Sequence, residues 1–334
     1  MRKAWFRKVN LVFCTLFILL VVLSGCSSAV NQSNANTANG KTEGNSTAGK
    51  KYVIGFSQAT MNNPHRVAMT EGNKKWVKEN FFDVEMIVTD GQNNATKQVA
   101  DVEDLIARKI DLLMISPITE DALSGVVKKA KDAGIKVVTL DRKVNTPVDL
   151  HIGAENKPIG VKVAKFLNGH LNGKGNIIEI QGTAGASATN DRHEGFMTEL
   201  KNYPGLKVIG TQYCDYLREN AMKYMEDMLQ RFGPGEIQAV YAHNDEEALG
   251  ALKAIEAANR LKEIAIVGVD GEELAIQAIK DGKMAYTVTY PFVAPEGAQN
   301  AYKLLKGEKL PAEIVLENKE IDAKNVSEWI GKGF

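Results

Sequence analysis

The chain has 334 residues, and its 41 basic and 41 acidic side chains give a formal net charge of zero. Without segment 1–25, which holds four basic and no acidic residues, the net charge would be −4. A mildly acidic chain without basic clusters argues against nucleic acid as a partner.

The first 25 residues predict an export signal. A basic start is followed by an apolar run over residues 11–23 and by Leu23-Ser24-Gly25-Cys26. The run is shorter than the roughly 20 residues of a bilayer span. Small residues before a cysteine resemble the bacterial lipoprotein pattern, in which the cysteine is lipidated and becomes the mature N-terminus. An ordinary signal peptide or a short anchor is the alternative. We therefore expect lipidation of Cys26 and a lipid-anchored protein on the extracytoplasmic face of the cell membrane.

Residues 27–50 predict a disordered tether. They are almost entirely small and polar, with no aromatic residue and one valine, Val30. Such a segment buries too little apolar surface to offset its ordering entropy. Its root-mean-square reach would be about 25–30 Å. Of the three cysteines, Cys14 leaves with the signal and Cys26 carries lipid, so Cys214 is expected to be an isolated buried thiol.

The body alternates between expected strands and helices. In the first half, short aliphatic runs predict strands at 52–58, 84–90, 111–117 and 136–142, and amphipathic stretches predict helices at 64–80, 95–109 and 119–133. In the second half, strands are expected at 176–182, 206–213, 239–245 and 264–270, with helices at 187–202, 217–232, 246–259 and 272–280. Continuous apolar strands between amphipathic helices indicate parallel sheets covered on both faces. The fold class is therefore α/β, with two doubly wound lobes.

Polar residues stand where the expected strands end. These residues are Gln58, Asp90, Asp141, Arg142, Asn244, Asp245 and Asp270, with Tyr216 and Tyr290 nearby in the chain. Open parallel sheets bind ligands outside the carboxyl ends of their strands. Carboxylates accept hydrogen bonds, Arg donates in a planar fork, and amides do both. An aromatic face covers the apolar side of a sugar ring. The set suits a neutral polyol.

Each position also has a purely structural explanation. Asn63-Pro64 is an ordinary helix start, and Asp245 can cap the following helix. Asp270-Gly271 is a turn signal, and Asp141 with Arg142 can close a strand as an ion pair. The joint placement at one sheet edge is what favours a binding site.

Several motifs together resemble the periplasmic sugar-binding proteins of ABC transporters, of the ribose-binding type. The matching stretches are Gly55-Phe56-Ser57-Gln58, Asn62-Asn63-Pro64, Asp90-Gly91-Gln92, Leu140-Asp141-Arg142, residues 181–187 and Tyr241-Ala242-His243-Asn244-Asp245. Several of these, with Asp191-Arg192 and Glu194-Gly195-Phe196, are most similar to the galactofuranose-binding subgroup.

The resemblance implies two lobes joined by three hinge segments, the type I periplasmic binding protein fold. The N-terminal lobe would comprise residues 51–154 and 291–316, and the C-terminal lobe residues 155–290 and 317–334. A monomer would capture a monosaccharide, either a hexose such as galactofuranose or a pentose, and deliver it to an ABC permease. No cofactor is implied.

The resemblance also implies the ligand contacts. Asp141 and Arg142 fall where the family binds ring hydroxyls, Asn244 and Asp270 complete the hydrogen bonds from the second lobe, and Tyr216 stacks on the sugar. Other positions depart from the pattern. Tyr290 replaces a Gln and Asn190 replaces an Arg, while His65-Arg66 stands where ribose binders carry two Phe and the galactofuranose subgroup carries Trp-Arg. The full expected set is Gln58, Asn63, His65, Arg66, Asp90, Asp141, Arg142, Asn190, Tyr216, Asn244, Asp270 and Tyr290.

Other functions find less support in the sequence. The turn after the first expected strand, residues 58–62, lacks the G-x-G-x-x-G of dinucleotide binders, and the glycines near Gln181 do not form a P-loop. The five histidines show no metal-ligand spacing. Counting acidic residues leaves a paired-carboxylate glycosidase open, although we do not expect an enzyme. The main rival is a receptor that presents a sugar or autoinducer to a sensor kinase or chemoreceptor.

Overall fold

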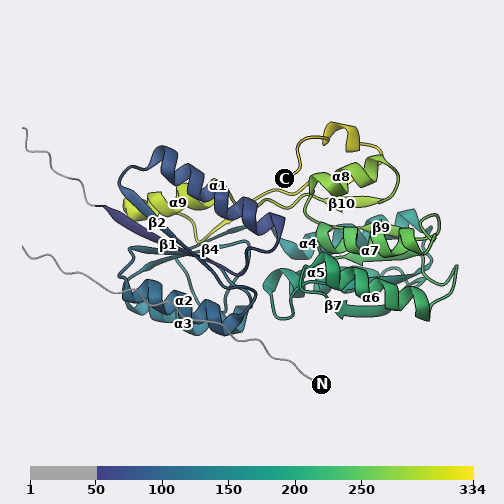
Figure 1. The fold of residues 1–334 in the computed structure, drawn as a ribbon, viewed down its shortest axis with the longest axis horizontal. Helices are drawn as coiled ribbons and strands as arrows, with labels where there is room; N and C mark the ends of the chain where they lie inside the picture. The colour runs from purple at the N-terminus through teal and green to yellow at the C-terminus, as the bar shows by residue number, and fades with distance from the viewer. Residues whose placement is uncertain (1–50) are drawn as a thin grey trace, which may run out of the picture. The chain divides into compact units, whose positions relative to one another are not determined.

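The computed structural model describes residues 51–334, and these form two α/β lobes (Figure 1). The signal peptide, Cys26 and the tether expected over residues 1–50 lie outside the described residues. The first sheet has the order β11-β5-β4-β3-β1-β2, with strands β1 (Tyr52–Gln58), β2 (Val84–Asp90), β3 (Leu112–Ser116), β4 (Lys136–Leu140), β5 (Leu150–Gly153) and β11 (Glu313–Val315). All its neighbouring strands run parallel.

The second sheet repeats this plan, in the order β12-β10-β9-β8-β6-β7. Its strands are β6 (Gly175–Gln181), β7 (Leu206–Tyr213), β8 (Ala239–Ala242), β9 (Ala265–Val267), β10 (Tyr286–Val288) and β12 (Glu320–Asp322). Only β12 runs antiparallel to its neighbour in this sheet. The predicted class, two doubly wound α/β lobes, is confirmed.

Helices cover both faces of each sheet. Helices α1 (Pro64–Asn80) and α9 (Glu296–Leu305) lie on one face of the first sheet, and α2 (Ala95–Ala107) and α3 (Glu120–Asp132) on the other (Figure 1). In the second lobe, α4 (Asn156–His170) and α5 (Ser187–Leu200) pack on one face, while α6 (Arg218–Arg231), α7 (Asp245–Ala257) and α8 (Glu273–Lys280) pack on the other. A single 3₁₀ turn, η1 (Val326–Glu328), follows β12.

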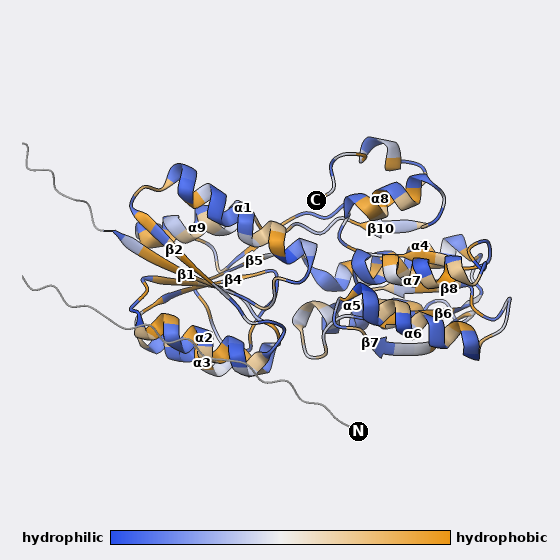
Figure 2. Ribbon diagram, viewed as in Figure 1, coloured by the Kyte–Doolittle hydropathy of each residue, from blue (hydrophilic) through white to orange (hydrophobic). Residues whose placement is uncertain are grey.

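The central strands of each sheet are buried because helices cover both faces. All five residues of β3 are buried, and β1 is buried from Ile54 to Gln58. Figure 2 shows hydrophobic colouring along the strands of the first sheet and hydrophilic colouring on much of the helices around it. Within residues 51–334, none of the helices has the length and apolar composition needed to cross a bilayer.

Side-chain caps begin some of the helices that follow strand ends, α1 and α7 among them. Asn63 accepts a hydrogen bond from the N–H of His65 at 3.0 Å, and Pro64 occupies the first turn of α1. Asn244 accepts from the N–H of Glu247 at 2.8 Å and begins α7 in the same way. These caps fix where the polar residues after β1 and β8 lie.

The chain passes between the two sheets three times. It leaves the first sheet after Gly153, returns between Val288 and Glu313, and leaves again between Val315 and Glu320. The expected lobe boundaries stay predictions, because sheet membership alone does not show which residues move together.

Several strand ends differ from the prediction. The strand expected over 136–142 ends at Leu140 because Asp141 adopts a left-handed backbone with φ 64°. The strand expected over 264–270 spans only Ala265–Val267, and Asp270 has φ 138°. The short elements β5, β10, β11 and β12 and the helices α4 and α9 were not predicted. Cys214 is fully buried and unpaired, as expected.

Helices α4 and α5 touch through glycine. A Cβ on Gly195 of α5 would lie 2.1 Å from the carbonyl oxygen of Lys157, and one on Gly160 of α4 would lie 2.2 Å from the carbonyl oxygen of Arg192. Any side chain there must force the two helices apart.

We therefore expect Gly195→Ala to lower the free energy of unfolding by about 1–3 kcal/mol, as overpacking does. Gly169→Ala in α4 is the matched control, because a Cβ there meets no atom within 4 Å. It should leave stability unchanged or raise it by up to about 1 kcal/mol. Denaturant unfolding of both variants gives the comparison. Equal stability of Gly195→Ala and the wild type would contradict the close helix contact.

Candidate ligand pocket between the lobes

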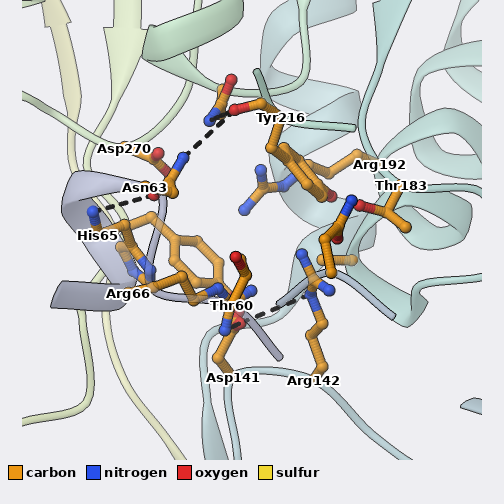
Figure 3. Close-up of a pocket in the computed structure, with 14 residues that line it drawn as sticks. Thr60, Asn63, His65, Arg66, Asp141, Arg142, Thr183, Arg192, Tyr216 and Asp270 are labelled. Atoms are coloured by element: carbon orange, nitrogen blue, oxygen red, sulfur yellow. Dashed lines mark hydrogen bonds and ion pairs between the residues drawn. The ribbon is translucent and has the colours of Figure 1, made fainter. Parts of the chain in front are cut away.

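A pocket lies between the two lobes, at the carboxyl ends of β1, β4, β6 and β8 (Figure 3). It is lined by Thr60, Asn63, His65, Arg66, Asn93, Asp141, Arg142, Thr183, Ala188, Arg192, Tyr216, Asn244, Asp270 and Tyr290. Its cavity volume is about 30 Å³, room for no more than a few water molecules. A larger ligand therefore requires the lining side chains or the lobes to move.

The first lobe supplies a buried ion pair to the pocket. Arg66, on the first turn of α1, places its guanidinium 2.6 Å from a carboxylate oxygen of Asp141, which follows β4. Arg66 also donates to the hydroxyl of Ser116 at the end of β3. Arg142 Nε lies 3.9 Å from the same carboxylate. All three charged side chains are less than 9% exposed.

The charges in this lobe shift one another's pKa. Burial acts to raise the pKa of Asp141, but Arg66, His65 and Arg142 hold it well below its ordinary value. Burial, reinforced by the charge of Arg66, lowers the pKa of Arg142 to about 10. Burial also lowers the pKa of His65 to about 3, with Arg66 and Arg192 adding to the effect and Asp141 opposing it. At neutral pH the lobe therefore presents one carboxylate, two guanidiniums and a neutral imidazole.

Two buried nitrogens of this lobe have no hydrogen-bond partner among the described residues. Arg142 Nε is a donor, and His65 Nε2 is an acceptor in the neutral ring, because the other ring nitrogen donates to the carbonyl oxygen of Pro291. Buried polar groups are nearly always paired, and an unpaired one costs about 1–3 kcal/mol. The pocket can therefore accommodate ligand hydroxyls, which both donate and accept.

The second lobe places an aromatic wall opposite this charge cluster. Tyr216 follows β7, and its hydroxyl lies 2.8 Å from Thr189 Oγ1. The guanidinium of Arg142 lies 5.1 Å from the centre of the Tyr216 ring. Asp270 lies on the same side of the pocket (Figure 3), and burial, with Asp245 and Asp141, raises its pKa well above the ordinary value although Arg192 opposes the shift.

Arg192, on α5, is the third guanidinium of the pocket. Its Nε donates to Asn156 at 2.9 Å, and it also donates to the carbonyl oxygen of His243. Its guanidinium lies 4.6 Å from the ring centre of Tyr290. Burial opposes its charge, but Tyr216 and Asp270 favour it and raise the pKa of Arg192 above its ordinary value.

Hydrogen bonds join the two lobes around the pocket. Asn63 Nδ2 donates to the carbonyl oxygen of Tyr216 at 3.3 Å. The backbone N–H of Lys143 donates to Ser187 Oγ at 2.9 Å, and that of Glu120 donates to the carbonyl oxygen of Gly185 at 3.1 Å. The lobes are thus in contact on both sides of the pocket. Within residues 51–334, no three His, Cys, Asp or Glu side chains gather in a way that could hold a metal ion.

A family model for the periplasmic binding protein domain matches residues 54–309. The chain belongs to this family. It is 37% identical over 273 residues to the ribose import binding protein RbsB of Bacillus subtilis, covering 81% of this chain and 87% of that protein. It is 31% identical over 273 residues to the galactofuranose-binding protein YtfQ of Escherichia coli, covering 79% of this chain and 85% of the relative.

The same fold occurs in the fructose-binding periplasmic domain of the hybrid two-component system BT1754. That structure matches with a TM-score of 0.80 and 30% identity, over 84% of this chain and 94% of the other. Similar lobes therefore serve both import proteins and a sensor.

Nine of the twelve expected site residues line the pocket of this binding protein. They are Asn63, His65, Arg66, Asp141, Arg142, Tyr216, Asn244, Asp270 and Tyr290. Their contact with a ligand stays a prediction.

The other three expected residues lie outside the pocket. The amide of Gln58 is fully buried behind it and donates to Thr70 Oγ1 at 3.2 Å. Asp90 accepts from the N–H of Gln92 at 2.8 Å and so closes the turn after β2. Asn190 is exposed on α5 and donates to Glu120 at 3.3 Å. The structure thus places these three side chains outside the pocket lining.

Five lining residues were not predicted. They are Thr60, Asn93, Thr183, Ala188 and Arg192. Arg192 carried a signal, since it belongs to the Asp191-Arg192 motif and lies two residues after Asn190 on the same helix. The two residues differ because Arg192 is 3% exposed and points into the pocket, whereas Asn190 faces the lobe margin.

The lowered pKa of His65 predicts that acid destabilises the folded protein. Unfolded histidine binds a proton below about pH 6.5, but buried His65 does so only near pH 3. Its folded-state pKa is lowered, so its contribution favours the folded form above pH 6.5 and is lost as the pH falls toward 3.

The variant His65→Phe keeps an aromatic ring but cannot titrate. The fall in unfolding free energy between pH 7 and about pH 4.5 should be about 2 kcal/mol smaller in this variant than in the wild type. His170→Phe, at an exposed position, serves as the control. A pH dependence of His65→Phe identical to the wild type would show that this imidazole does not couple to folding.

Proposed function

We propose that this protein captures a monosaccharide between its two lobes, outside the cytoplasm, and delivers it to an ABC permease. The observation that carries the proposal is the pocket itself, in which Asp141 and three guanidiniums from two lobes converge beside Tyr216. Donors and acceptors on opposite sides suit a ligand with hydroxyls on every edge, and the tyrosine ring suits its C–H face. The names of the relatives, which include binding proteins for ribose, galactofuranose and fructose, support a sugar.

Closure follows from the division of the site. Each lobe holds only part of the hydrogen-bonding groups, so a sugar makes its full set of contacts only when the lobes meet. The free-energy difference between sugar bound to the closed and to the open form shifts the population toward closure. We infer that the three passages between the sheets act as the hinge, and that a monomer in its closed form is what the permease recognises.

A panel of hexoses and pentoses, galactofuranose included, tests the proposal. Thermal shift identifies the sugar, calorimetry gives the affinity, and X-ray scattering reports compaction. No binding and no compaction with any saccharide would remove the proposed function. A product assay with candidate glycosides, which should show no hydrolysis, separates binding from catalysis.

Asp141→Ala should weaken sugar binding by about 100-fold, because a charged hydrogen bond contributes roughly 1.5–3 kcal/mol and Arg66 loses its partner. The protein should stay folded. Asp90→Ala is the matched control, since Asp90 also follows a strand but lies outside the pocket. Unchanged affinity in calorimetry of Asp141→Ala would contradict this assignment.

We further propose that Cys26 carries the lipid that holds the protein at the membrane. The Leu23-Ser24-Gly25-Cys26 box and the polar segment after it support this anchor. In cell fractionation, Cys26→Ser should move the protein from the membrane to the soluble fraction. Retention with lipid would place the anchor elsewhere.

A sensory role is the second candidate, and the similarity to the periplasmic domain of a two-component system favours it. Import and sensing use the same closing lobes. The genes that flank this one, for a permease and ATPase or for a kinase, distinguish the two.

A further inference from the structure

Tyr216 of the second lobe lines the pocket and contacts the first lobe. Its carbonyl oxygen accepts from Asn63 of the first lobe at 3.3 Å. Its ring lies beside Arg142, also of the first lobe, at 5.1 Å. The ring rests on Gly182, where a Cβ would come within 2.0 Å of it. The position of this one residue therefore affects both the pocket wall and the contact between lobes.

The backbone at Tyr216 is not one that an ordinary residue adopts freely. Asp215 and Tyr216 both have left-handed backbones, with φ of 60° and 61°. This region costs a residue with a side chain roughly 1 kcal/mol or more each. Two such residues in a row need a contact that holds them.

Glu247 makes that contact from α7. Its Oε1 accepts a hydrogen bond from the backbone N–H of Tyr216 at 2.8 Å. The side chain is fully buried, and its second oxygen, Oε2, has no partner among the described residues. Burial raises the pKa of Glu247 well above the ordinary value, although the backbone N–H of Tyr216 and Arg192 oppose the shift.

A buried carboxyl group at this position lowers the stability of the fold unless it is hydrogen-bonded. The buried neighbours of Glu247 on α7 include Ala248, Ala251 and Ile255, and a polar group placed among them without full hydrogen bonding destabilises the fold. Glu247 does not line the pocket. The hydrogen bonds of the carboxyl to the backbone of Tyr216 and of Asn244 are what this side chain supplies.

We propose that Glu247 is a positioning residue for ligand binding: it holds the Tyr216 wall and thereby the contact of that wall with the first lobe. This inference rests on the proposed function of sugar capture. It assigns part of the affinity to a residue that touches no ligand.

Three variants separate positioning from general packing. Glu247→Gln keeps a carbonyl oxygen for the Tyr216 N–H and carries no charge. Glu247→Met fills a similar volume but offers no acceptor of comparable strength. Glu256→Met, on the same helix, removes a partly exposed carboxylate that pairs with Lys283 at 2.8 Å and lies outside the pocket lining.

The first measurement is hydrogen exchange of the Tyr216 amide in the ligand-free protein, resolved by NMR. We expect exchange in Glu247→Met to be at least about tenfold faster than in the wild type, and exchange in Glu247→Gln and Glu256→Met to be close to it. Unchanged protection in Glu247→Met would overturn the proposal whether or not any sugar binds.

The second measurement is the affinity for the sugar found in the panel. Glu247→Met should bind about five- to tenfold more weakly, as expected for one lost hydrogen bond, while Glu247→Gln should be close to the wild type. Faster exchange at Tyr216 with unchanged affinity would reduce Glu247 to a structural role and overturn the proposal. If the wild type binds no sugar, the proposed function is wrong, and Glu247 has no role in ligand binding. Slow exchange of the Tyr216 amide in the wild type would then show that Glu247 still holds Tyr216, so that the error lies in the proposed function and not in the contact.

Discussion

The buried ion pair of Arg66 and Asp141 is the interaction on which the site depends. Two charges at 2.6 Å and less than 9% exposed are tolerated only when each satisfies the other, because removing either from water costs several kcal/mol. Arg66 follows β1 and Asp141 follows β4, and the guanidinium also reaches Ser116 at the end of β3, the strand between them. The pair thus connects the carboxyl ends of three neighbouring strands at the pocket.

The positive charge in the first lobe's part of the pocket exceeds its negative charge. Asp141 is shared by Arg66 and Arg142, so the first lobe presents more donors than acceptors. The second lobe places the ring of Tyr216 beside Arg142 and contributes the carboxyl group of Asp270 to the pocket. It also contributes Arg192, so the pocket contains three guanidinium groups but only two carboxyl side chains, Asp141 and Asp270. A ligand rich in acceptor oxygens is the natural complement, and hydroxyls supply acceptors and donors together.

The sequence predicts much of the fold and part of the site. Strands such as β1 and β2 were predicted to the residue because long apolar runs end in polar turns. The unpredicted strands β10, β11 and β12 have three residues each, too few for a period to emerge. Asp141 and Asp270, at expected strand ends, line the pocket. Gln58 and Asp90 do not, since the side chain of Gln58 turns into the core and that of Asp90 bonds its own turn. Only tertiary contacts determine whether a polar residue at a strand end lines the pocket. The same is true of α5, where Arg192 lines the pocket and Asn190 does not.

Of the three positions expected to depart from the family pattern, His65 and Tyr290 lie together in the pocket, whereas Asn190 lies outside its lining. The rings of His65 and Tyr290 lie 5.6 Å apart, and Arg192 lies over Tyr290 at 4.6 Å. His65 comes from the first lobe, Arg192 from the second, and Tyr290 from the passage between β10 and α9. Residues in mutual contact do not act independently, and their effects on affinity are not additive. Exchanging His65 alone for the residue of a relative therefore changes the environment of Tyr290 and Arg192 as well. Under the proposed function, the ligand preference therefore depends on these three side chains together.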